Sequence, residues 1–173
     1  MLTDGNILLR PYSLGDREAL VELANNFNVS KYLQNRFPYP YTLDSADSWI
    51  AMVGMDLEPH NFAIEWQGKF IGGIGLNPLA DIHYQTAEIG YWLGEPFWGN
   101  GLATIATGIF ICHVFSNLKF LRLQAMTIEE NKPSARILEK NGFILEGKLN
   151  KHVTKYGRVY NALLYAKTRD NGM

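Results

Sequence analysis

Apolar and polar positions repeat along the chain with two different periods, and these periods predict which segments form helices and which form strands. Apolar residues three or four positions apart predict four helices, in residues 13–24, 43–57, 102–115 and 131–141. Alternating or continuous apolar runs predict seven strands, in residues 7–10, 62–66, 69–76, 86–93, 119–128, 143–151 and 159–167. This order, β-α-α-β-β-β-α-β-α-β-β, indicates a single α/β (α+β) domain over residues 1–173, with helices layered on a mixed sheet.

Capping and turn residues add detail to two of these segments. Thr42 is expected to cap the second helix, whose apolar stripe extends to Leu57. Three glycines, Gly72, Gly73 and Gly75, interrupt the strand at 69–76. Because glycine weakens a strand, they predict either a bulge or the close approach of another backbone at this place.

The composition narrows the possible functions. Hydrophobic residues make up 47% of the chain and the formal net charge is -1, so the sequence predicts a folded domain without the basic surplus of most nucleic-acid-binding proteins. Cys112 is the only cysteine, which rules out a disulfide framework, and we expect it to pack as a small hydrophobe. The four histidines lack metal-ligand spacing. With no signal pattern and no apolar run of about 20 residues, a cytoplasmic protein is expected.

The stretch from Glu88 to Thr104 carries the most specific chemical signal. An apolar strand is followed by a turn that contains Gly99 and Gly101, and then by the start of the longest apolar helix. The first N–H groups of a helix have no intrahelical acceptor, and glycines let the main chain approach a ligand closely. The pattern therefore predicts a seat for a pyrophosphate-bearing cofactor, although a tight strand-to-helix turn alone is an alternative. A Rossmann dinucleotide loop fits less well, because Thr104 occupies the position of its third glycine.

Two motifs in this order resemble those of a known family. Trp98-Gly99-Asn100-Gly101-Leu102-Ala103-Thr104 resembles the coenzyme A pyrophosphate loop of the GNAT acyltransferases, written Q/R-x-x-G-x-G/A, with Trp98 in place of Gln or Arg. The segment N-K-P-S-A-R-I-L-E-K-N-G-F at 131–143 is similar to the family's second motif, N-x-x-S-x-x-x-L-E-K-x-G-F. With A-E-I-G-Y-W-L and P-Y-T, the chain resembles the branch that contains ribosomal-protein N-terminal alanine and serine acetyltransferases. The resemblance covers nearly the whole chain.

The resemblance implies a GNAT-like acyl-CoA N-acyltransferase fold, with a mostly antiparallel seven-stranded sheet and about four helices. It also implies acetyl-CoA as the acetyl donor and is compatible with a homodimer, while the spacing of the histidines predicts that no metal is bound. The coenzyme would lie where the strand at 86–93 diverges from the strand at 119–128. The residues implied in its binding are Trp92, Leu93, Trp98, Gly99, Asn100, Gly101, Leu102, Ala103, Thr104, Asn131, Ser134 and Lys140. For Lys140, a place on a solvated helix face is an equal alternative.

Two residues are candidates for catalysis. Glu88 shares a strand face with Gly90 and Trp92, so its carboxylate is a candidate base that takes a proton from the acceptor amine, or else a structural strand-end group. Many members of the family have a tyrosine where this chain has Leu138, which cannot donate a proton to the departing thiolate. Ser134, one helical turn earlier, is the candidate substitute, unless its hydroxyl only bonds the helix backbone.

The acceptor is the least defined part of the prediction. We expect the acceptor pocket to be lined by Glu88 and by three aromatic residues of a loop with two prolines, Phe37, Tyr39 and Tyr41. The alternative is that these aromatic rings only pack over the core. We expect direct acetyl transfer in a ternary complex, since no nucleophile paired with a histidine is visible.

The favoured acceptor is a protein N-terminal α-amine. The alternatives are a small amine, such as a polyamine, an amino acid or an aminoglycoside, and an inactive coenzyme A-binding regulatory module. A strongly cationic acceptor would need an acidic cleft, for which Asp44, Asp47, Asp56 and Glu58 are available.

Overall fold

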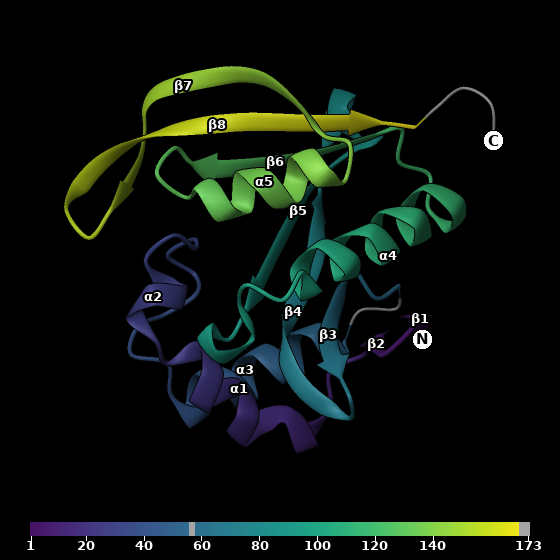
Figure 1. Ribbon diagram of the computed structural model, residues 1–173, viewed down its shortest axis with the longest axis vertical. Coiled ribbons are helices and arrows are strands. Elements are labelled where there is room, and N and C mark those ends of the chain that lie inside the picture. Colours follow the sequence, from purple (N-terminus) through teal and green to yellow (C-terminus); the bar gives the residue numbers. More distant parts are fainter. Residues whose placement is uncertain (56–57, 170–173) are drawn as a thin grey trace.

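The computed structural model describes residues 1–55 and 58–169, and within these residues one sheet of eight strands forms the centre of the molecule (Figure 1). Its order is β1-β2-β3-β4-β5-β6-β8-β7, and every neighbouring pair is antiparallel except β5 and β6. The strands are β1 (Leu2–Asp4), β2 (Ile7–Arg10), β3 (Asn61–Trp66), β4 (Lys69–Pro78), β5 (Thr86–Leu93), β6 (Arg122–Ile128), β7 (Ile144–Lys155) and β8 (Arg158–Thr168).

The mixed, mostly antiparallel sheet was predicted from the sequence, apart from its first strand. β1 pairs with β2 through a two-residue turn in which Gly5 has a φ of 58°. Such a positive φ at the first turn position suits a tight hairpin. Because β1 has three residues, of which one is apolar, the hydrophobic pattern gave no signal for it.

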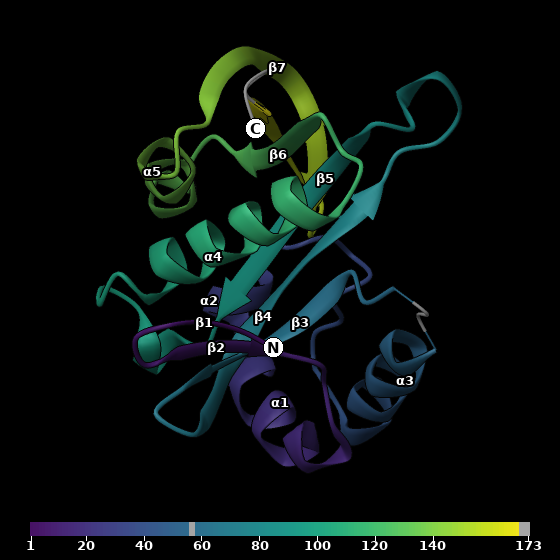
Figure 2. The same ribbon diagram turned by 90° about the vertical axis from the view of Figure 1, so that its right-hand side faces the viewer.

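Helices cover both faces of the sheet, as Figures 1 and 2 show from two sides. The helices are α1 (Arg17–Ala24), α2 (Phe27–Ser30), α3 (Leu43–Gly54), α4 (Leu102–Asn117) and α5 (Lys132–Lys140). Thr42 caps α3 as predicted, since its hydroxyl accepts a hydrogen bond of 3.2 Å from the N–H of Ser45. Leu57, which the apolar stripe of this helix was expected to include, lies outside the described residues.

Two apolar layers hold the helices to the sheet. On one face, buried residues of α4 and α5 such as Phe110 and Leu138 pack against Leu123 and other strand residues. On the other face, Leu20 of α1 and Ile50 of α3 pack against the strands. Burying apolar surface on both faces is what stabilises such a layered domain. The expectation that Cys112 packs as a small hydrophobe is wrong, because its position on α4 is exposed.

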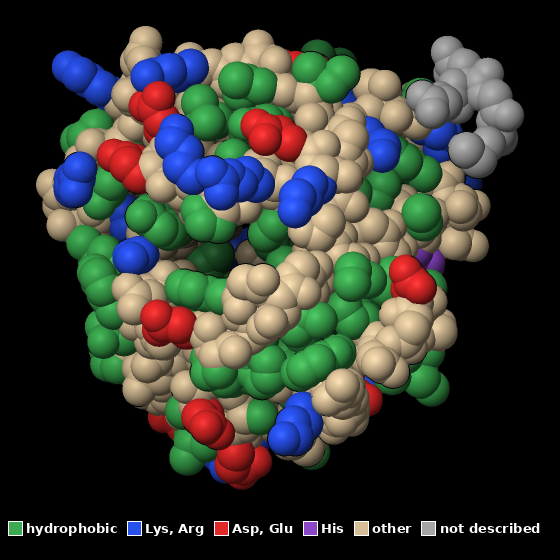
Figure 3. Space-filling model, viewed as in Figure 1, with side chains coloured by type: hydrophobic (Ala, Val, Ile, Leu, Met, Phe, Trp, Pro, Cys, Tyr) green, Lys and Arg blue, Asp and Glu red, His purple; other side chains and the backbone are tan. Residues whose placement is uncertain are grey.

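The sheet is divided in the middle, and this division creates space for a ligand. β5 and β6 pair only from Thr86 opposite Arg122 to Glu88 opposite Gln124. Beyond Glu88 the two strands diverge, so residues 89–93 have no strand partner on that side. Figure 3 shows a hollow in this face of the molecule, below a row of Lys and Arg side chains that gather over α5.

The glycines of β4 allow close approach, as predicted. A Cβ at Gly72 would collide with the main-chain carbonyl oxygen of Trp92 on β5, and one at Gly73 would collide with the hydroxyl of Tyr12. The one register shift between β3 and β4 lies at Ile64/Glu65 instead. Close strand and side-chain approach is therefore the reason for these glycines.

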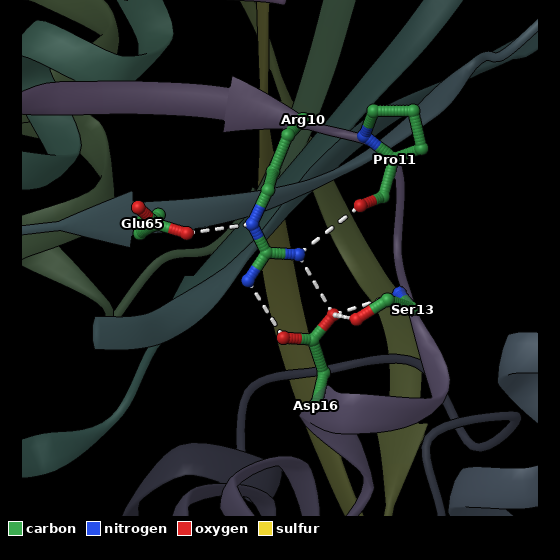
Figure 4. A network of polar contacts seen from close by, with 5 residues as sticks. All are labelled: Arg10, Pro11, Ser13, Asp16 and Glu65. Carbon is green, nitrogen blue, oxygen red and sulfur yellow. Dashed lines mark hydrogen bonds and ion pairs between the residues drawn. The ribbon is translucent and has the colours of Figure 1, made fainter. Parts of the chain in front are cut away.

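A polar network fixes the start of α1 to the sheet (Figure 4). The guanidinium of Arg10 donates to both oxygens of the buried Asp16 at 2.7 and 2.8 Å, and to Glu65 at 2.6 Å. Asp16 also accepts from the N–H of Ser13 at 2.8 Å. Burial opposes ionisation of Asp16, but these donors outweigh it and hold the pKa of its carboxyl below the usual value.

Candidate active site

The turn before α4 has the conformation that its glycines permit. Gly99 has a φ of 80° and Gly101 a φ of 75°, and no atom lies within 4 Å of the space where a Cβ would be. The first α4 bond runs from the N–H of Ile105 to the carbonyl of Gly101, and no side chain caps the helix. The N–H groups of residues 102–104 thus lack an acceptor in the helix, which makes this end suited to an anion such as a pyrophosphate.

Trp98 braces this turn. Its indole Nε1 donates to the carbonyl oxygen of Leu93 at 2.8 Å, and the amide of Asn100 donates to the carbonyl of Trp98 at 3.2 Å. Leu93 itself is buried, and its carbonyl is already engaged. The main-chain groups of Trp92 face β4, where this residue pairs with Gly73, as those of Gly94 and Thr86 also do. The main-chain groups that remain on the unpaired side of β5 are those of Tyr91 and the N–H of Leu93.

α5 forms the opposite wall of the division and is tied to the start of α4. The amide of Asn141 at the end of α5 donates to the carbonyl of Thr104 at 3.2 Å and to that of Ile137 at 2.9 Å. Asn131 begins the helix, and among the described residues its side chain forms no capping hydrogen bond. Lys140 lies on the exposed side, on the same helix as Arg136. Asn141 thus fixes α5 to the start of α4, a contact that sequence reasoning did not identify.

Ser134 has an unforeseen partner. The hydroxyl of Tyr91 lies 3.0 Å from the Ser134 Oγ and donates to the Ser134 main-chain carbonyl at 3.1 Å. Burial raises the pKa of Tyr91, so it stays a neutral donor. Leu138, by contrast, is fully packed in the core. The alternation of side chains along β5 could have predicted this contact, because it places Tyr91 with Ile89 and Leu93 on the face of the sheet that α4 and α5 cover.

A cavity of about 660 Å³ opens at the divided strands. Seven aromatic residues contribute to its wall: Tyr12, Tyr32, Phe37, Tyr41, Trp49, Tyr91 and Trp92. Among the predicted site residues it brings together Phe37, Tyr41, Glu88, Trp92, Asn131 and Ser134.

Tyr39 does not line this cavity. It is 45% exposed and packs on Phe27, with ring centroids 5.7 Å apart. The aromatic loop therefore contributes two of its three predicted residues to the wall.

Charged groups in the cavity are few. Glu88 is partly exposed, and its Oε1 accepts a hydrogen bond of 3.4 Å from the side-chain amide of Gln34. The other charged residues in the wall are Asp44 and Arg36.

The carboxylates that were available for an acidic cleft gather at the cavity only in part. Asp47 is paired with Arg17 at 2.8 Å, Glu58 lies outside the cavity wall, and Asp56 lies outside the described residues. Along residues 1–55 and 58–169, no three His, Cys, Asp or Glu side chains are grouped as a metal site would require. In the same part of the chain, no helix has the length and apolarity to cross a bilayer.

The divided sheet, the uncapped helix start and the adjoining cavity define an acyltransferase that uses a coenzyme A thioester. Residues 6–144 match the acetyltransferase (GNAT) domain, and the chain belongs to this family. It is an acetyl-CoA-dependent N-acetyltransferase.

Relatives and solved structures agree with this assignment. The chain is 29% identical to the uncharacterized N-acetyltransferase YoaA of Bacillus subtilis, over 96% of this chain and 95% of that protein. It is 32% identical to the ribosomal-protein-serine acetyltransferase of Escherichia coli, over 64% of this chain and 61% of that one. The crystal structure of the microcin C7 self-immunity acetyltransferase MccE, in complex with acetyl-CoA and AMP, superimposes with a TM-score of 0.84 at 27% identity, covering 96% of this chain and 94% of that one.

Proposed function

We propose that the protein transfers the acetyl group of acetyl-CoA directly to a primary amine that enters through the aromatic cavity. The observation that carries this proposal is the shared wall of the cavity, where Glu88 of β5 and Ser134 of α5 face the same space at the point where the sheet divides. The reaction needs a base that takes the proton of the amine and an acid that protonates the leaving sulfur, one on each side of the thioester carbon. Glu88 would be the base and Ser134 the acid.

The coenzyme would occupy the division of the sheet. The N–H groups from Gly99 to Thr104 would hold its pyrophosphate, and the unpaired edge of β5 near Trp92 would pair with the pantetheine arm as another strand would. The free side-chain amide of Asn131 supports a hydrogen bond to the same arm. Lys140 and Arg136 would attract the remaining phosphates over the outer face of α5.

The reaction needs two proton transfers. Glu88, directly or through a water molecule, takes the proton from the attacking amine as the C–N bond forms and the C–S bond breaks. The sulfur then takes the proton of the Ser134 hydroxyl, whose orientation Tyr91 sets by its 3.0 Å contact, and the Ser134 oxygen takes a proton back from the solvent to which Glu88 releases the proton of the amine. Because two neighbouring elements supply this hydroxyl pair, the loss of the usual tyrosine at Leu138 leaves the acid function intact, which disfavours an inactive coenzyme-binding module.

The acceptor we favour is a protein N-terminal α-amine. An α-amine has a pKa of about 7.7–8.0, so it is partly neutral near pH 7 and needs only the weak base that Glu88 provides. The similarity to the Escherichia coli enzyme, which acts on a ribosomal protein, supports this choice.

A small amine is the second candidate, and the wall of the cavity decides which kind. The aromatic residues of the cavity favour a small acceptor with an apolar or planar part. The structure of MccE, which has the same fold, contains the small molecule AMP in addition to acetyl-CoA. A polyamine is less well supported, because Asp44 and Glu88 share the wall with Arg36.

An acceptor screen tests the proposal. Thiol release from acetyl-CoA would be followed with short peptides that copy protein N-termini, with amino acids, with aminoglycosides and with spermidine. We expect turnover with peptides that have a free α-amine and none with the same peptides acetylated beforehand. Tight binding of acetyl-CoA without thiol release for any acceptor would overturn the proposal in favour of a coenzyme-binding module.

A further inference from the structure

A second, smaller pocket of about 360 Å³ adjoins the acceptor cavity. It lies between α2, the loop after β6 and the tip of the β7–β8 hairpin, segments that are far apart in the sequence (Figure 1). Tyr32 lines both spaces, so the pocket is an extension of the acceptor side of the molecule. Its lining consists of Phe27, Lys31, Tyr32, Glu130, Lys155, Tyr156, Arg158 and Tyr160.

The pocket has an excess of positive charge. It contains the cations Lys31, Lys155 and Arg158 against the single carboxylate of Glu130, which lies 3.6 Å from Arg158. Lys155 is only 3% exposed, and among the described residues its ammonium group has no hydrogen bond and no ion pair. The ammonium nitrogen itself is not sealed from solvent, so it reaches the space of the pocket, and an anion there would form a charge-assisted hydrogen bond with it.

The hairpin turn places two of these cations directly opposite each other. Tyr156 and Gly157 have φ values of 50° and 75°, which form a two-residue turn and bring Lys155 into register with Arg158. Like charges at directly opposed positions of two strands are destabilising.

Aromatic rings hold the cations and form the walls. Lys155 lies 4.7 Å from the ring centre of Tyr156, Arg158 lies 4.8 Å from that of Tyr160, and Lys31 lies 5.1 Å from that of Tyr32. These contacts position the cations by cation–π attraction and leave them able to bind an anion.

The hairpin tip is itself anchored to α2. The Tyr156 hydroxyl lies 3.2 Å from the hydroxyl of the fully buried Ser30, and its ring packs on Phe27 at 5.5 Å. The pocket is therefore built between two elements that fix each other.

We propose that this pocket binds a carboxylate or phosphate group of the acceptor, so that the enzyme prefers amines that carry a negative charge at the end remote from the amine. This proposal rests on the proposed function for its acceptor but not for the anion site itself. The coenzyme's phosphates are not its expected occupants, because none of the residues 99–104 lines the pocket.

The anion site can be tested without any turnover. Inorganic phosphate would be titrated into the ¹⁵N-labelled protein, and we expect saturable shifts of the amide signals around Lys155 and Arg158. Lys155→Met, which keeps most of the apolar stem of the side chain and removes its charge, and the more exposed Arg158→Gln are each expected to weaken phosphate binding at least tenfold. Lys69→Met, at the exposed β3–β4 turn, is the charge-matched control. The absence of saturable shifts at the hairpin in the wild-type protein would overturn the anion site.

The acceptor preference needs matched substrates. Peptides of two to five residues, each made with a C-terminal carboxylate and with a carboxamide, differ by one negative charge, and each added residue extends the reach by about 3.3–3.6 Å. At the length that spans the two spaces, we expect the carboxylate to be favoured at least tenfold in kcat/KM.

Lys155→Met should bring the two peptides to equal kcat/KM, whereas Lys69→Met should keep the preference. Saturable phosphate binding without a carboxylate preference at any length would overturn the assignment to the acceptor. Failure of every peptide to turn over would count against the proposed function, while the phosphate titration still decides on the anion site.

Discussion

The pair formed by Ser134 and Tyr91 allows a quantitative prediction about the departing thiolate. If the Ser134 hydroxyl supplies the proton, Ser134→Ala removes general acid catalysis, which contributes about 100-fold at the lower end of its range. We take the lower end because a thiol with a pKa of about 8.5 is a fairly good leaving group. Tyr91→Phe removes one neutral hydrogen bond, worth about 1 kcal/mol, so kcat should fall about fivefold.

The double variant separates a joint role from two independent ones. If Tyr91 acts only by orienting Ser134, the double variant should lose about 100-fold in kcat, the same as Ser134→Ala alone. Two independent contributions would multiply to about 500-fold. Steady-state thiol release at saturating acetyl-CoA measures kcat, and the KM for acetyl-CoA should change little in all three variants.

The pH dependence gives a second readout of the same pair. Because burial raises the pKa of Tyr91, its hydroxyl stays protonated below its ordinary pKa of about 10. The ratio of wild-type to Tyr91→Phe kcat should therefore be constant between about pH 6 and pH 9. Full activity of Ser134→Ala, or a 500-fold loss in the double variant, would refute the reasoning, provided that thermal melting shows the variants to be folded.

Three further predictions concern the base, the coenzyme loop and the fold. Glu88→Gln should lower kcat/KM for the acceptor about 10–100-fold near pH 7, because the group that takes the proton of the amine is lost. Gly101→Glu should raise the KM for acetyl-CoA at least about 100-fold, because a side chain at φ 75° costs about 1–2 kcal/mol and its charge repels the phosphates. Asp16→Asn should lower the free energy of unfolding by about 3 kcal/mol, or about 6–12 °C in Tm, because it leaves the Arg10 guanidinium without its main partner.

A control variant and the pH dependence of stability test two of these predictions further. Gly54→Glu adds the same charge at an open, exposed position of α3 and should leave the KM for acetyl-CoA unchanged. The pKa of Asp16 is depressed in the folded state, so its stabilising effect is present above the ordinary value of 3.8 and is lost as the pH falls. The stability gap to Asp16→Asn should thus narrow towards pH 3. A gap that stays constant, an unchanged kcat/KM in Glu88→Gln, or tight acetyl-CoA binding by folded Gly101→Glu would each contradict the corresponding role.

Features that depend on local chemistry could be predicted from the sequence. The positive φ at Gly99 and Gly101, the cap at Thr42 and the close approach at Gly72 follow from what these residue types permit. The division of the sheet followed from the family resemblance, since no local pattern reveals where two parallel strands part.

Features that depend on tertiary contacts could not be read in advance. The Tyr91–Ser134 contact joins residues that are 43 positions apart, and Tyr39 turns away from the cavity because Phe27 offers a packing surface. In the sequence, Lys155 has the pattern of an ordinary polar strand residue. It is buried only because the hairpin packs on α2. Strand β1 is too short for its apolar residue to show a period.

The central claim is that the main-chain N–H groups at the start of α4 hold the pyrophosphate of the coenzyme. A titration of coenzyme A into the ¹⁵N-labelled protein, followed by ¹H–¹⁵N correlation spectra, tests it directly. The account predicts that the amide signals of residues 99–104 show the largest shifts, and that 3′-dephospho-coenzyme A, which keeps the pyrophosphate, shifts the same signals. Saturable binding that leaves these amide signals in place and shifts others would contradict the account.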